Sequence, residues 1–196
     1  MSERLVIDRL GAQGDGIAGR GQGAVFVPYA LAGEVVTADV RGSRAALVSV
    51  DEASPLRIAP ACRHFGACGG CAMQHLEADA YRAWKRDIVV QGLHSRGIEA
   101  PVADLVPCAP HSRRRATFAA RRTEAGMLLG FNRANSADIV AIEECPIMLP
   151  AIESALGGLR KVADAVCATG RPFHLAVTMT ASGLDVAATD SGGLDD

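Results

Sequence analysis

Short apolar runs separated by glycine-rich turns fill the first 58 residues of the chain. Four runs rich in Val, Ile and Leu stand out: RLVIDRL, AVFVP, EVVTADV and RAALVSVDE. Several short strands at this spacing predict a small closed β-barrel over residues 1–58. The glycine-rich segment 11–23 predicts a turn between strands and not a phosphate-binding loop, because it runs into the apolar residues 25–27 instead of opening a helix.

After the cysteine-containing segment, the spacing of apolar residues is first that of a helix and then again that of strands. From Glu77 to about Arg96 the apolar residues recur at helical spacing, and Gly97 ends the pattern. Residues 113–143 return to strand-like runs, with a plausible hairpin turn at 123–126.

A second helix is predicted to begin near Pro150, and residues 174–190 follow as a hairpin. The apolar face of this helix would carry Ile152, Leu156, Leu159, Val162 and Val166. One helix packed on one side leaves a sheet face without a covering layer, so we expect the last domain to be truncated. The predicted organisation is a barrel at 1–58, a cysteine loop and helix at 59–97, and an incomplete α+β domain at 98–196.

Composition places this chain away from membranes. No segment has the run of roughly 18 apolar residues that a membrane helix needs, and the N-terminal MSERLVIDRL lacks the apolar core of a signal peptide. We therefore expect a cytoplasmic, monomeric protein that contacts no membrane.

Charge is concentrated in one short stretch. The net charge is only −2, yet residues 111–133 carry six Arg against Glu124 alone. Five of these arginines surround a strand-like core: Arg113, Arg114, Arg115, Arg121 and Arg122. On a strand, 113, 115 and 121 would lie on one face and 114 and 122 on the other. Arginine suits RNA because its planar fork pairs with phosphate and stacks on bases. From the residues alone, pairing of this strand with the acidic residues of 138–153 is an equal alternative.

Three cysteines fall within the segment CRHFGACGGCAMQH: Cys62, Cys68 and Cys71. In a reducing compartment such a cluster indicates metal ligation more than disulfides. A fourth ligand is missing from the segment, and the candidates are Cys108, Cys145, Cys167, His64 and His75. Pro146 follows Cys145, as in the last ligand of one class of iron–sulfur sites. The spacing favours iron–sulfur, with zinc on Cys62, Cys68, Cys71 and His75 as the alternative.

These segments resemble a known family. CRHFGACGGCAMQHL and EECPIMLP are similar to the cysteine signature and the later fourth-ligand segment of bacterial RNA 5-methyluridine methyltransferases that carry a 4Fe–4S cluster. GAQGDGIAG and AVFVPYALAGEVVTADV resemble the TRAM domain of that family. The resemblance implies an OB-like TRAM barrel, then an α+β central domain whose cluster is held by Cys62, Cys68, Cys71 and Cys145.

The family's catalytic part has no counterpart in this sequence. The C-terminal Rossmann-like domain, which binds S-adenosylmethionine and carries the cysteine nucleophile, is not matched by any segment, so we name no catalytic residue. The expected function is the RNA-recognition and iron–sulfur portion of such an enzyme, inactive by itself, with 23S ribosomal RNA as target and transfer RNA left open. The alternative is a free-standing RNA-binding module, held by iron–sulfur or zinc, without catalytic activity.

Overall fold

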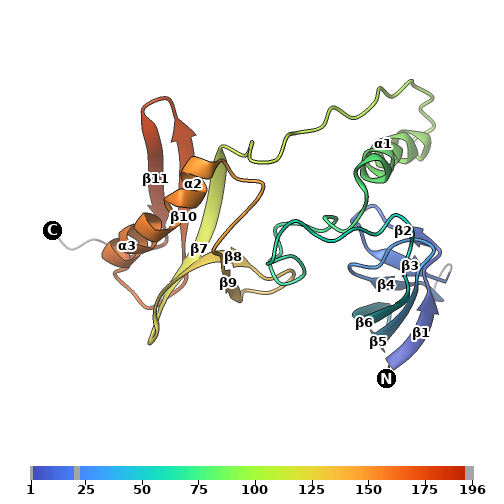
Figure 1. Ribbon diagram of the computed structural model, residues 1–196, viewed down its shortest axis with the longest axis horizontal. Helices are drawn as coiled ribbons and strands as arrows, with labels where there is room; N and C mark the ends of the chain where they lie inside the picture. The colour runs from blue at the N-terminus through green and yellow to red at the C-terminus, as the bar shows by residue number, and fades with distance from the viewer. Residues whose placement is uncertain (1, 20–22, 193–196) are drawn as a thin grey trace. The chain divides into compact units, whose positions relative to one another are not determined.

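The computed structural model of the protein describes residues 2–19 and 23–192 (Figure 1). These residues form two compact units. The first unit consists of Met1–Pro60 and Ala72–Pro107, and the second of Ala61–Cys71 and Cys108–Asp196. The cysteine-bearing segment therefore groups with the second unit, whereas the helix that follows it groups with the first. The division into three domains predicted from the sequence stays a prediction.

The first unit contains a six-stranded sheet. Its strands are β1 (Ser2–Val6), β2 (Arg9–Leu10), β3 (Gly16–Ala18), β4 (Val25–Val27), β5 (Val35–Arg41) and β6 (Arg44–Glu52). They are ordered β1-β5-β6-β4-β3-β2. The predicted apolar runs all contain strands. The sheet order ends at β1 and β2, and no ladder joins those two within the described residues, so the closed barrel is not confirmed.

One strand lies where the sequence predicted only a turn. β3 occupies Gly16–Ala18 inside the glycine-rich segment, and all three of its residues are buried. A Cβ atom at Gly16 would lie 2.8 Å from the carbonyl oxygen of Ala30 and 2.9 Å from Cγ2 of Ile7, so the strand can pack here only as glycine. The prediction of a turn was wrong for these residues, and residues 20–22 of the segment lie outside the described part.

The predicted helix is confirmed as α1 (Ala78–His94). Glu77 caps it, because its carboxylate accepts hydrogen bonds from the backbone N–H groups of Asp79 and Ala80. Trp84 packs against a small core of buried residues that includes Leu31. In the described part of the chain, neither α1 nor any other helix is long and apolar enough to cross a membrane.

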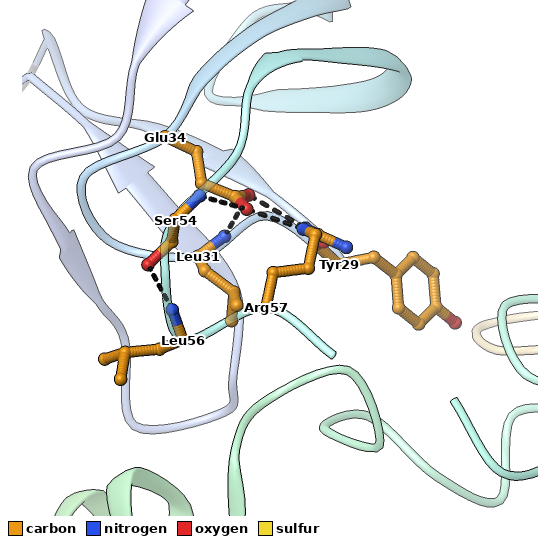
Figure 2. A network of polar contacts seen from close by, with 6 residues as sticks. All are labelled: Tyr29, Leu31, Glu34, Ser54, Leu56 and Arg57. Carbon is orange, nitrogen blue, oxygen red and sulfur yellow. Dashed lines mark hydrogen bonds and ion pairs between the residues drawn. The ribbon is translucent and has the colours of Figure 1, made fainter. Parts of the chain in front are cut away.

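A buried carboxylate joins several loops of the first unit (Figure 2). Glu34 has no exposed surface, and it accepts hydrogen bonds from the backbone N–H groups of Leu31 at 2.8 Å and Ser54 at 3.2 Å. Arg57 Nε lies 2.5 Å from its Oε1, and the same guanidinium donates to the carbonyl of Tyr29 at 2.7 Å. Burial alone would raise the pKa of Glu34, but the bonds from Arg57, Leu31 and Ser54 outweigh it and lower that pKa.

The same arginine stands at the base of the cysteine loop, which we define as residues 59–74. Arg57 and Leu76 form an antiparallel bridge, and the N–H of Ile58 donates to the carbonyl of His75 at 2.9 Å. The two ends of the cysteine loop are therefore joined to each other within the first unit.

His75 is a core residue of the first unit. Its side chain has no exposed surface, and its ring meets that of Tyr29 edge-on, with the centroids 6.4 Å apart. Burial, reinforced by the positive charge of Arg57, lowers the pKa of His75 to about 4, although the charge of Glu34 acts the other way. The imidazole is therefore neutral at pH 7.

The second unit is built on a five-stranded antiparallel sheet with the order β11-β10-β7-β8-β9. Its strands are β7 (Arg115–Thr123), β8 (Gly126–Asn132), β9 (Ile139–Ala141), β10 (Phe173–Thr180) and β11 (Gly183–Thr189). Both predicted hairpins are confirmed. β7 and β8 pair up to Thr123 and Gly126, and β10 and β11 pair up to Thr180 and Gly183.

Two helices cover one face of this sheet, α2 (Pro150–Ser154) and α3 (Leu156–Val166), where the sequence predicted one continuous helix (Figure 1). Apolar side chains of the sheet and helices share one core, which includes Phe118, Leu129, Leu175, Ile152, Leu156, Leu159 and Ala163. Val162 was predicted to face this core but is 41% exposed. Ala163 takes its place, because the spacing of the buried positions continues from 152, 156 and 159 to 163.

Replacing Glu34 with Gln should lower the unfolding free energy of the first unit by about 3 kcal/mol, because Arg57 would keep its charge without a carboxylate partner. The measurement is urea unfolding at pH 7, followed by the fluorescence of Trp84, which is the sole tryptophan of the chain. Glu52→Gln is the matched control. Glu52 pairs with Arg4 on the surface, so its loss should stay below about 1 kcal/mol. Equal losses in the two variants would contradict this role of Glu34.

The first unit should also lose stability as the pH falls from 7 toward 4. The pKa of His75 is about 4 in the folded chain against an ordinary 6.5, so the unfolded chain binds the extra proton in this window. Above pH 6.5 the titration of His75 does not lower the unfolding free energy. By pH 4 it lowers that free energy by about 3 kcal/mol. Glu34, whose pKa is lowered, adds to the loss below its ordinary value of 4.5.

Urea unfolding curves at intervals from pH 7 to pH 4.5 measure this effect. His75→Gln should flatten the pH dependence whatever it does to the absolute stability, whereas replacement of the exposed His94 with Gln should leave the slope unchanged. An unfolding free energy of the unmodified chain that is constant over this range would show that the fold does not hold His75 neutral.

Candidate metal centre and basic strand

All four cysteines of the predicted ligand set belong to the second unit. Cys62, Cys68 and Cys71 lie on the cysteine loop, Cys145 follows β9, and each is partly buried. Burial raises the pKa of the Cys62 and Cys68 thiols, and the neighbouring Cys145 adds to the increase for both. The structure thus brings the thiol of the distant segment beside those of the loop.

The thiols are neighbours, but they do not form a compact metal site. Within the described ranges, no three His, Cys, Asp or Glu side chains are gathered closely enough to hold a metal ion. Because the pKa values of Cys62 and Cys68 are raised, a metal would have to displace their protons on binding.

The other candidates for a fourth ligand are placed differently. Cys108 is exposed, and the buried Cys167 donates a hydrogen bond from its Sγ to the carbonyl of Thr169 at 2.8 Å. His75 is part of the core of the first unit. His64 lies on the cysteine loop, but its Nε2 accepts a hydrogen bond from the backbone N–H of Glu143 at 3.2 Å. Cys145 is the candidate whose thiol lies near those of Cys62 and Cys68, and the ligand set stays a prediction.

Backbone pairing attaches the cysteine loop to the end of β8. The N–H of Gly69 donates to the carbonyl of Asn132 at 2.9 Å, and Cys68 forms an antiparallel bridge with Arg133. A Cβ atom at Gly69 would lie only 2.7 Å from the backbone nitrogen of Ala134 and 2.8 Å from the carbonyl oxygen of Asn132. The glycine is thus required by the close approach of two backbones.

Charged side chains attach the loop to the segment that carries Cys145. Arg63 pairs with Glu143 at 3.2 Å and with Glu144 at 3.3 Å. The N–H of Cys145 in turn donates to Glu153 at 3.1 Å. None of these four charged residues was predicted from the sequence to belong to the site. The signal was present, because Glu143 and Glu144 directly precede Cys145 and Arg63 directly follows Cys62.

The five arginines of the basic strand divide into two groups. Arg122 bonds to Asp164 of α3, with Nη2 at 2.6 Å from the carbonyl oxygen and 3.0 Å from Oδ1, and Arg114 donates to the carbonyl of Met179 at 3.3 Å. Arg115 and Arg121 are exposed on the opposite side. Arg113, also exposed, precedes β7, so the predicted strand alternation does not extend to it. The alternative of pairing with residues 138–153 was wrong for Arg122, whose partner lies in α3.

The chain is similar to curated proteins along almost its whole length, although no family model matches it. An uncharacterised RNA methyltransferase of Mesorhizobium japonicum is 59% identical over 194 residues, which make up 99% of this chain and 47% of that protein. A second uncharacterised RNA methyltransferase, from Brucella suis, is 51% identical over 98% of this chain and 46% of its own length. The predicted resemblance to RNA methyltransferases is confirmed, and the chain spans about half the length of these relatives.

The name of another relative states the reaction that this relative catalyses. The 23S rRNA (uracil(1939)-C(5))-methyltransferase RlmD of Halomonas elongata is 39% identical over 180 residues, which cover 87% of this chain and 37% of that enzyme. This similarity supports the resemblance to RlmD-like RNA methyltransferases that the cysteine signature indicated.

Replacing Gly69 with Ala should detach the cysteine loop from β8, because the new Cβ would overlap the backbone at residues 132–134. We expect hydrogen–deuterium exchange in peptides spanning 61–71 to become at least about tenfold faster, which corresponds to about 1.4 kcal/mol of local stability. Gly70→Ala is the matched control, since the nearest atom to its Cβ is Cys68 Sγ at an ordinary 3.4 Å. Equal protection in both variants would show that Gly69 does not hold the loop.

Proposed function

We propose that this chain is the RNA-recognition and iron–sulfur-binding portion of an S-adenosylmethionine-dependent RNA 5-methyluridine methyltransferase that acts on 23S ribosomal RNA. In this proposal the sheet of the first unit is the TRAM-like, OB-type barrel of the family, and the second unit is its central α+β domain. Methyl transfer itself would need the Rossmann-like domain, which no segment of this sequence resembles.

The names of the relatives support the RNA target and the methyl donor. RlmD enzymes are named for C5 methylation of a uracil in 23S rRNA, and RNA methyltransferases of this kind use S-adenosylmethionine. The relatives from Mesorhizobium japonicum and Brucella suis carry the broader name RNA methyltransferase. Ribosomal RNA is therefore the proposed substrate, in preference to transfer RNA.

The donor set supports a 4Fe–4S cluster held by Cys62, Cys68, Cys71 and Cys145. Four cysteine thiolates are the usual ligands of such a cluster, and these four lie on two segments that the fold already places side by side. When bound, the cluster would supply a covalent link between the cysteine loop and the segment after β9. The ion pairs of Arg63 already join these two segments, and the backbone bond of Gly69 attaches the cysteine loop to the end of β8. Zinc held by Cys62, Cys68 and Cys71 without Cys145 is the competing assignment.

The distribution of charge supports RNA recognition by the second unit. Six arginines against one glutamate in residues 111–133 create a local positive field in a chain of net charge −2. Binding to phosphates through this field would weaken as salt increases, because counterions released from RNA oppose it. This contact is proposed for the basic strand at residues 113–122, without assigning it to particular arginines.

Metal analysis of protein purified without oxygen tests the proposal. We expect a brown protein with about four iron and four acid-labile sulfide per chain. Cys145→Ser should lose the cluster or make it labile, while Cys108→Ser, at an exposed cysteine outside the set, should retain it. A colourless protein that holds stoichiometric zinc and is indifferent to Cys145→Ser would overturn the iron–sulfur assignment and leave a zinc-held RNA-binding module.

A further inference from the structure

Within the described residues, no helix lies on the face of the five-stranded sheet opposite α2 and α3, although the backbone of β9 approaches it at Gly130. Side chains alternate along β7, so Phe118 and its neighbours at 116 and 120 enter the core while Arg115, Thr117 and Arg121 point to the other side. Cross-strand pairing places Thr178 beside Arg115, and Leu128 beside Arg121. We call this side the open face.

Arg115 and Arg121 mark two ends of the open face. Six residues of extended strand place their Cα atoms about 20 Å apart. Both side chains are exposed, and neither forms a hydrogen bond or ion pair with another described residue. Arg114 and Arg122 lie on the other side and are engaged by the carbonyl of Met179 and by Asp164. Strand alternation thus leaves one pair of arginines available to a ligand and binds the other pair to the protein.

Small residues lie between the two arginines. On β7 these are the exposed Thr117 and the buried Ala119, with Ala176 of β10 beside Thr117 and the buried Gly130 of β8 beside Ala119. A Cβ atom at Gly130 would overlap the carbonyl oxygen of Val140, so the accessible part lies around Thr117 and Ala176, where a sugar–phosphate backbone could lie close to the sheet. Next to Ala119 on β10 is the exposed ring of His174, a surface on which a base can stack.

We propose that the open face binds a single-stranded segment of the RNA, with Arg115 and Arg121 each holding a phosphate and His174 available for stacking. This inference rests on the proposed function and makes it specific. It assigns RNA contact to Arg115 and Arg121 and withdraws it from Arg114 and Arg122.

The chemistry of the open face favours RNA over a protein partner. Protein interfaces are centred on large aromatic and aliphatic side chains that become fully buried. The open face instead offers small residues with two unpaired guanidinium groups. Its acidic residues stand away from Arg115: Asp185 of β11 is paired with Thr178 of β10, and Asp190 lies 3.9 Å from Nδ1 of His174. A ligand with regularly spaced negative charge is complementary to this arrangement.

Fluorescence anisotropy with a labelled single-stranded RNA of about 15 nucleotides tests the inference on the 196-residue chain. The double variant Arg115→Ala/Arg121→Ala should weaken binding at least about tenfold. Between about 50 and 200 mM salt, its log–log slope should become shallower by about 1.4, which is 0.7 for each lost phosphate contact. The double variant Arg114→Ala/Arg122→Ala removes the same net charge and is the matched control. It should keep the slope and stay within about twofold of the unmodified affinity.

A third variant removes no arginine. Thr117→Glu places a carboxylate on the open face between the two arginines, and it should weaken binding while the core residues on the other side stay unchanged. Thermal unfolding of each variant confirms that it is folded at the temperature of the binding measurement.

The outcomes separate this inference from the proposed function. If the unmodified chain binds RNA in a salt-dependent manner but only Arg114→Ala/Arg122→Ala alters the slope, the open face is not the RNA site, and the proposed function stands. The same conclusion follows if both double variants weaken binding equally. If the unmodified chain binds no RNA at any salt concentration, the RNA-recognition proposal fails together with this inference.

Discussion

A carboxylate without exposed surface stays ionised only where hydrogen bonds and a nearby cation replace the water that it has lost. Glu34 meets this condition with groups from separate parts of the first unit, namely the N–H of Leu31, the N–H of Ser54 and the guanidinium of Arg57. One charge therefore fixes the turn before β5 and the segment after β6 at the same time. Because Arg57 also pairs with Leu76, the start and the end of the cysteine loop depend on that carboxylate.

In the second unit, the corresponding constraint is the two-residue period of β7. Phe118 must enter the core below α2 and α3, and that requirement decides the direction of every other side chain on the strand. Arginines that are close together in the sequence are therefore divided between the two faces of the sheet and have different neighbours. On the helix side, Arg122 pairs with Asp164 and Arg114 donates to the carbonyl of Met179. The arginines of the open face have no such partners among the described residues, so their positive charge faces solvent.

Local signals were enough to predict the hairpins, the helix from Glu77 and the alternation of β7, because each is set by residues close in the sequence. Features that depend on distant neighbours were not predictable. β3 forms inside a glycine-rich segment because Gly16 fits against Ala30 and Ile7, and nothing in the segment shows this packing. The buried role of Glu34 requires three loops to meet. The choice of Cys145 as the fourth thiol came from family resemblance to its segment, whereas spacing alone left five candidates open.

Neither unit is a continuous stretch of chain, since residues 61–71 interrupt the first unit and complete the second. During synthesis, this segment leaves the ribosome before β7, β8 and β9 exist. Its three thiols and the amide of Gly69 must therefore remain without their native neighbours until Asn132 and Cys145 have been made. Pairing of the two ends of the cysteine loop limits the conformations that the loop can adopt. If the first unit folds first, the cysteine loop is already closed when β8 and the segment of Cys145 are made.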